Sequence, residues 1–187
     1  KNFARIPDSP IVYWVSEKLL KSFEHSLIKS LGEPKKGMVT ANNDKYLRMW
    51  HEIAKDTLGL NIKSLEQAKN SSYTWFPYNK GGEYRKWYGN IEYCINWRNG
   101  GEDLYNEKKF SDRNVNYSFT QGLTWTVVTN SNFSIRLQKQ GFMLDAAAGV
   151  IYNIDKSLVN YLLAALNTKI LNECIKFILF SYLLRTM

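Results

Sequence analysis

The stretch from Tyr73 to Trp97 reads YTWFPYNKGGEYRKWYGNIEYCINW. Its two ends, residues 73–78 and 93–97, are rich in aromatic and β-branched side chains, a composition typical of β-strands. Residues 79–90 between them are polar and interrupted by glycines, which favour loops. The stretch therefore predicts two strands separated by a long polar connection that carries several aromatic side chains.

Further short apolar runs follow this stretch. They predict strands over residues 123–129, 133–137, 142–144 and 150–152, with turns over residues 130–132 and 139–141. Together with the first two strands, they indicate a central, mostly antiparallel sheet with long aromatic loops.

Helical patterns lie on both sides of the strand region. An apolar stripe predicts a first helix, capped by Asp8 or Ser9, with Pro10 in its first turn and Gly32 and Pro34 at its end. Residues 35–37 then predict a loop, and residues 44–58 a second helix capped by Asn42 or Asn43. Asp155 or Ser157 caps a helix expected to run to Leu166, and another is expected after Asn167.

The order of helices, then strands, then helices predicts an α+β fold rather than a doubly wound sheet. With 187 residues, the chain has the length of one domain. We expect a single domain over residues 1–187, with a helical lead-in (1–70), a β-rich core (71–153) and C-terminal helices (154–187). The chain begins without Met and ends within apolar sequence, so we expect it to be part of a longer protein.

Charge and aromatic content point to a polyanionic partner. The chain has 25 Lys and Arg against 17 Asp and Glu, a net charge of +8, and 14% aromatic residues. A basic, aromatic-rich surface is suited to nucleic acid.

Two cysteines and two histidines exclude a disulfide framework and a cysteine- or histidine-rich metal site, and favour free thiols in a cytoplasmic protein. The apolar segment 170–184 is too short to span a bilayer, so no membrane partner is expected.

Residues 75–90 hold the densest set of candidate nucleic-acid contacts. Cationic side chains neutralise phosphates, and aromatic rings pack against sugars or bases. Other basic positions lie near a predicted helix start, a turn and a strand that exposes one face. The candidates are Lys45, Arg48, Asn79, Lys80, Arg85, Lys86, Tyr88, Arg98 and Arg136. The alternative for each is an ordinary solvated surface residue.

Six stretches resemble a family of large bacterial adenine-specific DNA methyltransferases, which includes the methyltransferase of the BREX phage-defence system and related type II restriction-modification enzymes. They are residues 6–16, 40–50, 75–90, 122–126, 141–145 and 161–169. The block over residues 75–90 is the most specific. One departure is Thr40-Ala41-Asn42, where the family pattern is Thr-Gly-x.

The resemblance implies a module that recognises a double-stranded DNA sequence for an N6-adenine methyltransferase of a restriction-modification or phage-defence system. S-adenosylmethionine and the catalytic Asn/Asp-Pro-Pro-Tyr/Phe motif would belong to a catalytic domain of the same parent chain, because neither that motif nor a cofactor motif occurs in these residues. We therefore expect no catalytic, cofactor or metal residue here.

Two other classes stay open from the residues themselves. A free-standing nuclease would need a carboxylate cluster, which the sequence does not suggest. A protein-interaction domain would carry its charge incidentally. In the parent, we expect neighbouring protein to cover the apolar C-terminal helix, and self-association through this helix when that partner is missing.

Overall fold

The computed structural model describes residues 17, 21, 30–129 and 131–175. Most of the expected first helix therefore lies outside the described residues, although Glu17 and Lys21 within it are helical. The expected C-terminal helix is described only as far as residue 175, and residues 169–175 are helical.

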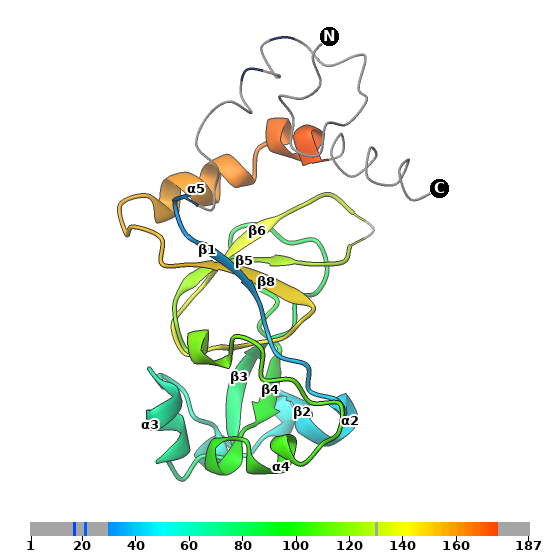
Figure 1. Cartoon of the computed structure of the whole chain (residues 1–187), viewed down its shortest axis with the longest axis vertical. Helices are drawn as coiled ribbons and strands as arrows, with labels where there is room; N and C mark the ends of the chain where they lie inside the picture. The colour runs from blue at the N-terminus through cyan, green and yellow to red at the C-terminus, as the bar shows by residue number, and fades with distance from the viewer. Residues whose placement is uncertain (1–16, 18–20, 22–29, 130, 176–187) are drawn as a thin grey trace.

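The first sheet is fully antiparallel and has four strands in the order β1-β8-β5-β6 (Figure 1). Its strands are β1 (Glu33–Lys36), β5 (Gly122–Thr126), β6 (Ile135–Gln138) and β8 (Ala148–Tyr152). Helix α5 (Val159–Leu166) packs against this sheet, because Leu162 and Leu166 share a buried cluster with Leu123 and Ile135.

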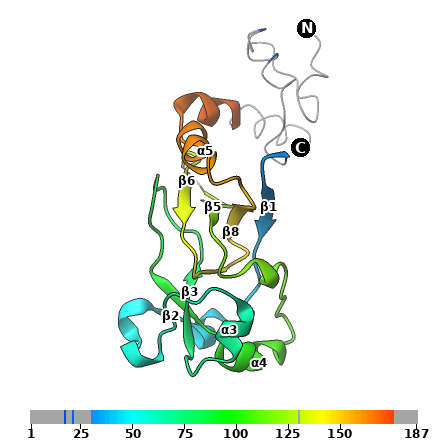
Figure 2. The same ribbon diagram turned by 90° about the vertical axis from the view of Figure 1, so that its left-hand side faces the viewer.

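The second sheet contains the two strands predicted around residues 73–97. Its order is β2-β4-β3-β7, from β2 (Leu47–Met49), β3 (Trp75–Asn79), β4 (Tyr93–Asn96) and β7 (Met143–Leu144). β3 and β4 are antiparallel, with Tyr78 opposite Tyr93, whereas β7 lies parallel to β3. The first sheet lies between α5 and this second sheet in both views (Figures 1 and 2).

Short helices complete the described part of the chain. The α-helices are α2 (Asn43–Tyr46), α3 (Leu65–Lys69) and α4 (Glu102–Tyr105), and the 3₁₀ turns are η3 (Trp50–Glu52), η4 (Lys55–Thr57), η5 (Arg98–Gly100) and η6 (Val115–Tyr117). Two mostly antiparallel sheets with a few helices confirm the predicted α+β class. The boundaries 1–70, 71–153 and 154–187 stay a prediction.

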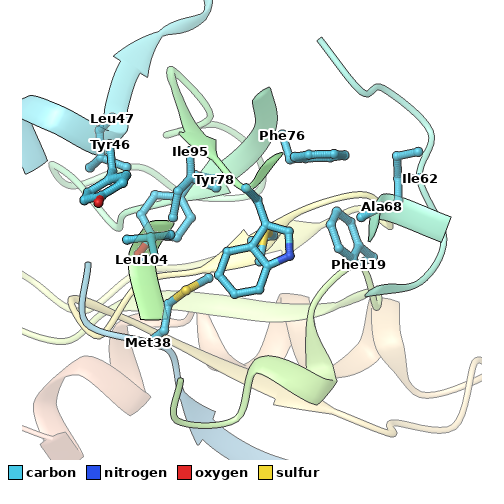
Figure 3. Close-up of a cluster of buried hydrophobic side chains, with 12 residues drawn as sticks. Met38, Tyr46, Leu47, Ile62, Ala68, Phe76, Tyr78, Ile95, Leu104 and Phe119 are labelled. Atoms are coloured by element: carbon cyan, nitrogen blue, oxygen red, sulfur yellow. The ribbon is translucent and has the colours of Figure 1, made fainter. Parts of the chain in front are cut away.

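The larger core belongs to the second sheet (Figure 3). Phe76 and Ile95 from β3 and β4 are fully buried with Phe119, Leu104 and Met38. The rings of Phe76 and Phe119 meet edge to face with their centroids 5.9 Å apart. This core holds β3 and β4 in place, and with them the two ends of the connection between these strands.

Three local predictions are wrong. The expected helix over residues 44–58 ends at Tyr46, because Leu47–Met49 pairs with β4 as an edge strand. The expected loop at residues 35–37 is partly strand β1, which pairs with β8. Helix α5 begins at Val159 without a side-chain cap, and Asp155 instead accepts hydrogen bonds from Ser157 in the preceding turn. In each case, tertiary pairing or a local turn replaces the pattern expected from the sequence.

Two other predictions hold. Asn42 caps α2, since its side chain accepts a hydrogen bond from the Lys45 amide at 3.1 Å. Cys94 and Cys174 are free thiols, and burial raises the pKa of Cys94 to about 11.

The loop before α2 provides a stability prediction. Ala41 has a φ of 63°, in the left-handed region that costs an L-residue about 1–2 kcal/mol. Ala41→Gly should relieve this strain and raise the free energy of unfolding by about 1 kcal/mol after the entropic cost of glycine. Urea unfolding measures the change. The control is Ala54→Gly, also exposed but with a φ of −63°, which should lower stability; equal effects of both substitutions would refute the strain at Ala41.

Candidate nucleic-acid interface

The β3–β4 connection (residues 80–92) begins at a buried amide network. The Asn79 side-chain nitrogen donates to the Thr124 hydroxyl at 2.7 Å and to the Gln138 side-chain oxygen at 2.6 Å. Its side-chain oxygen accepts from the Gly81 amide at 3.1 Å. Asn79 thus joins the first sheet to the second and sets the direction in which the connection leaves β3. Its role in DNA binding stays a prediction, and its side chain is buried.

A second buried contact, close to Asn79, joins β3 to the segment between β7 and β8. The Tyr78 hydroxyl donates to the Asp145 carboxylate at 2.7 Å, and burial and that carboxylate raise the Tyr78 pKa well above its ordinary value. The other Asp145 oxygen accepts from the Ala147 amide. The hydrogen bonds of Asn79 and Tyr78 therefore fix the start of the connection.

The middle of the connection runs along the edge strand β6. The Trp87 amide donates to the Ile135 carbonyl at 3.1 Å, and the Trp87 carbonyl accepts from the Leu137 amide at 2.8 Å. Trp87 has a φ of 72°, which is rare for a bulky side chain and is typical of functional sites. These two hydrogen bonds hold the residue in that conformation, in which the residue is 52% exposed.

Aromatic and basic side chains share the outer surface of the connection. Tyr84, Trp87 and Tyr88 are all exposed, and the Lys139 ammonium lies 5.2 Å from the centre of the Tyr88 ring. The exposed Arg85 guanidinium is 3.5 Å from the Glu92 carboxylate. Exposed pairs of this kind contribute little to stability, so Arg85 can exchange Glu92 for another anion at small cost.

An open hollow lies beside the start of the connection. It has a volume of about 710 Å³ and is bordered by Lys80, Tyr84, Thr126 and Ser131, among others. Lys80 is half-buried, with its ammonium 5.7 Å from the centre of the Tyr93 ring. The hollow therefore combines one cation, the Glu83 carboxylate, one aromatic side chain and several hydroxyl groups. The cation and the hydroxyl groups are suited to a sugar-phosphate chain, whereas the carboxylate opposes an anion.

Lys86 and Arg136 face inward. The Lys86 ammonium donates to the Asn167 carbonyl at the end of α5 at 2.8 Å, which links the connection to that helix. Arg136 is 0% exposed, so the expectation that it lies on an exposed strand face is wrong. The connection lies against this side chain, since the Arg85 carbonyl accepts a hydrogen bond from the Arg136 guanidinium.

The remaining predicted contacts lie apart from the connection along the chain. The Lys45 ammonium is 2.9 Å from the Glu107 carboxylate, and the neighbouring Tyr46 hydroxyl and this carboxylate raise the Lys45 pKa. Arg48 donates to the carbonyls of Asp44 and Leu47 and lies over the Trp75 ring. Arg98 is exposed at η5. Of the predicted set, Arg85 and Tyr88 are the members that the connection places on its exposed surface, with Lys80 at its edge.

Three surface residues were missing from the predicted set: Tyr84, Trp87 and Lys139. The signal for the two aromatics was present, because they alternate with the basic residues of the connection. Aromatic side chains in a strand-rich stretch are usually assigned to the core, and only the tertiary structure shows that these two residues are exposed. Lys139 directly follows β6, and the tertiary structure places it beside Tyr88.

Neither a metal site nor a membrane span is seen in the residues described. Among them, no three His, Cys, Asp or Glu side chains are grouped so as to hold a metal ion. No helix in the same part of the chain is both long and apolar enough to cross a bilayer.

Comparison with known proteins confirms the resemblance seen in the sequence. The chain is 36% identical over 176 residues to the adenine-specific methyltransferase PglX of Lacticaseibacillus casei (strain Zhang), a match that covers 89% of this chain. It is 37% identical over 175 residues to the adenine-specific methyltransferase BrxX of Escherichia coli O9:H4 (strain HS), which covers 91% of this chain. In both cases the match spans 14% of the relative. No protein-family model matches the chain.

Proposed function

We propose that this chain, which is homologous to one segment of the adenine-specific methyltransferases PglX and BrxX, is a module that recognises a sequence in double-stranded DNA. The observation that carries the proposal is the β3–β4 connection. It is held on two sheets and presents Arg85, Trp87 and Tyr88 to solvent from fixed backbone positions. A charged and aromatic surface on a rigid support is what a nucleic-acid interface requires.

The proposed contacts divide into two classes. Lys80 and Arg85 bind phosphates, which sets the position of the module on the duplex but carries no sequence information. Tyr84, Trp87 and Tyr88 lie beside these cations and contact sugars and base edges in the groove. Because Lys86 donates to the carbonyl of Asn167, its proposed contribution to DNA binding is the placement of the connection against α5.

The parent protein is proposed to methylate adenine at N6 in a cytoplasmic restriction-modification or phage-defence system. In this proposal, S-adenosylmethionine binds to a catalytic domain of the same parent chain, and the present module selects the site. The support comes from the names of the two relatives and from the small share of their length that this chain spans.

The DNA-binding proposal has a direct test. We expect the purified chain to bind a fluorescently labelled duplex with an affinity that falls linearly on a plot of log affinity against log salt concentration. Selection from a library of randomised duplexes should then enrich one sequence motif. Salt-dependent binding without enrichment would contradict sequence recognition, and no binding at low salt would contradict DNA binding altogether.

A second test concerns catalysis. We expect no transfer of labelled methyl groups from S-adenosylmethionine to DNA by this chain alone, because its sequence has neither the catalytic nor the cofactor motifs of these enzymes. The measurement is incorporation of label into a mixed-sequence duplex, with a known adenine methyltransferase as the positive control. Incorporation that co-purifies with the chain through two chromatographic steps would refute this assignment.

A further inference from the structure

Arg136 is a fully buried cation without an anionic partner among the described residues. One of its terminal nitrogens donates to the Arg85 carbonyl and the other to the Thr126 hydroxyl, both at 3.4 Å. Its Nε has no hydrogen-bond partner there. Burying a charge costs several kcal/mol unless a counter-charge and good hydrogen bonds compensate for it. Two long hydrogen bonds to neutral groups compensate for little of this cost.

A second guanidinium lies next to this buried charge. Arg85, whose carbonyl accepts from Arg136, directs its own side chain to the exposed surface. Burial and the positive charge of Arg85 lower the Arg136 pKa, and the Glu92 carboxylate opposes that effect. Glu92 is paired with Arg85 rather than with Arg136. Two cations therefore share one carboxylate, and the local charge is positive.

The backbone next to Arg136 is held in place by hydrogen bonds. Trp87 lies opposite Arg136 and is hydrogen-bonded to the residues on both sides of it, Ile135 and Leu137. The Thr126 hydroxyl that accepts from Arg136 donates to the Gly82 carbonyl at 2.8 Å. Arg136 thus contacts the middle of the β3–β4 connection directly, at the Arg85 carbonyl, and is linked to its beginning through the Thr126 hydroxyl. A charge in this position is little screened by solvent and acts strongly on the surface above it.

We propose that Arg85 and Arg136 together form a phosphate site of the DNA interface, in which Arg85 contacts the phosphate and Arg136 strengthens its binding from beneath the connection. This inference rests on the proposed DNA-binding function and assigns one phosphodiester group of the duplex to this place. Arg136 is a positioning residue, because it is covered by the connection and does not touch the DNA. Glu92 is the internal anion that the phosphate replaces at Arg85.

The test compares stability with DNA affinity in the same variant. Arg136→Met removes the buried charge and keeps a long side chain, so the unfolding midpoint of the free protein should be unchanged or raised. Affinity for a labelled duplex at low salt should fall roughly tenfold, as expected for one charge acting through the protein interior. The matched control is Arg113→Met, the same substitution at an exposed arginine outside the connection, for which less than a twofold change is expected.

A second variant changes affinity in the opposite direction. Glu92→Gln removes the competing carboxylate with little change in shape, so DNA affinity should rise several-fold while the salt dependence stays steep. If Arg136→Met does not fold, this rise still supports the site, and unchanged affinity in Glu92→Gln refutes it.

The outcomes separate the two proposals. If the wild-type chain does not bind the duplex, the proposed function fails. If the wild type binds with the expected salt dependence but Arg136→Met is less stable and binds equally well, Arg136 is only part of the scaffold. In that case the phosphate site is refuted and the DNA-binding function stands.

Discussion

The double substitution Lys80→Ala and Arg85→Ala is expected to lower DNA affinity at least tenfold at low salt and to flatten the salt dependence. Each phosphate contact contributes about 0.9 to the slope of log affinity against log salt, so the slope should fall by about 1.8. Lys80 lies at the hollow beside the connection and Arg85 on its outer surface, and their removal leaves the buried networks at Asn79 and Asp145 intact.

The control for this measurement carries the same change in charge elsewhere. Lys108 and Lys109 are exposed and lie between α4 and η6, outside the connection. Their double replacement by alanine should reduce affinity only slightly, through the lower net charge of the chain. An equal loss in both double variants would show that DNA is attracted by the overall charge and has no defined site on the connection.

The substitution Phe76→Ala is expected to have the largest effect on stability. Phe76 is fully buried in β3 and meets the ring of Phe119, so its truncation should lower the free energy of unfolding by about 3–5 kcal/mol. Urea denaturation followed by circular dichroism gives this change. Since marginal domains have only about 5–15 kcal/mol of stability, the variant should be close to unfolding at physiological temperature.

A conservative variant at the same position shows whether the loss of stability comes from the lost packing of the ring or from any substitution at this position. Phe76→Leu keeps most of the apolar volume and should cost distinctly less than Phe76→Ala. Trp50→Ala removes a larger side chain that is 59% exposed and should change stability by only about 0.5 kcal/mol. Similar losses in all three variants would contradict the core shown in Figure 3.

The sequence was sufficient for the elements whose local preference and tertiary role agree. Strands β3 and β4 were predicted because their aromatic and β-branched side chains favour extended structure and also fill the core of the second sheet. The α+β class followed from the order of such elements. The basic and aromatic character of the connection was equally visible, since composition requires no knowledge of the fold.

The tertiary structure alone decided the edge strands. Residues 47–49 have the spacing of an amphipathic helix with their neighbours, yet hydrogen bonding to β4 makes them a strand. The spacing of apolar residues reports which side chains are buried, but pairing with a distant strand determines the backbone conformation in a short segment.

The exposure of side chains at the candidate interface also could not be predicted from the sequence alone. In a strand, alternate residues point to opposite faces, so Arg136 could be assigned to one face of β6 but not to the inside or the outside of the protein. The Arg136 side chain became buried because residues about fifty positions earlier in the chain lie against it, with the Arg85 carbonyl accepting from its guanidinium and Trp87 paired with β6 beside it. The sequence therefore determined which basic and aromatic side chains the connection and β6 carry. The long-range packing of the connection against β6 decided that Trp87 is exposed and Arg136 is buried.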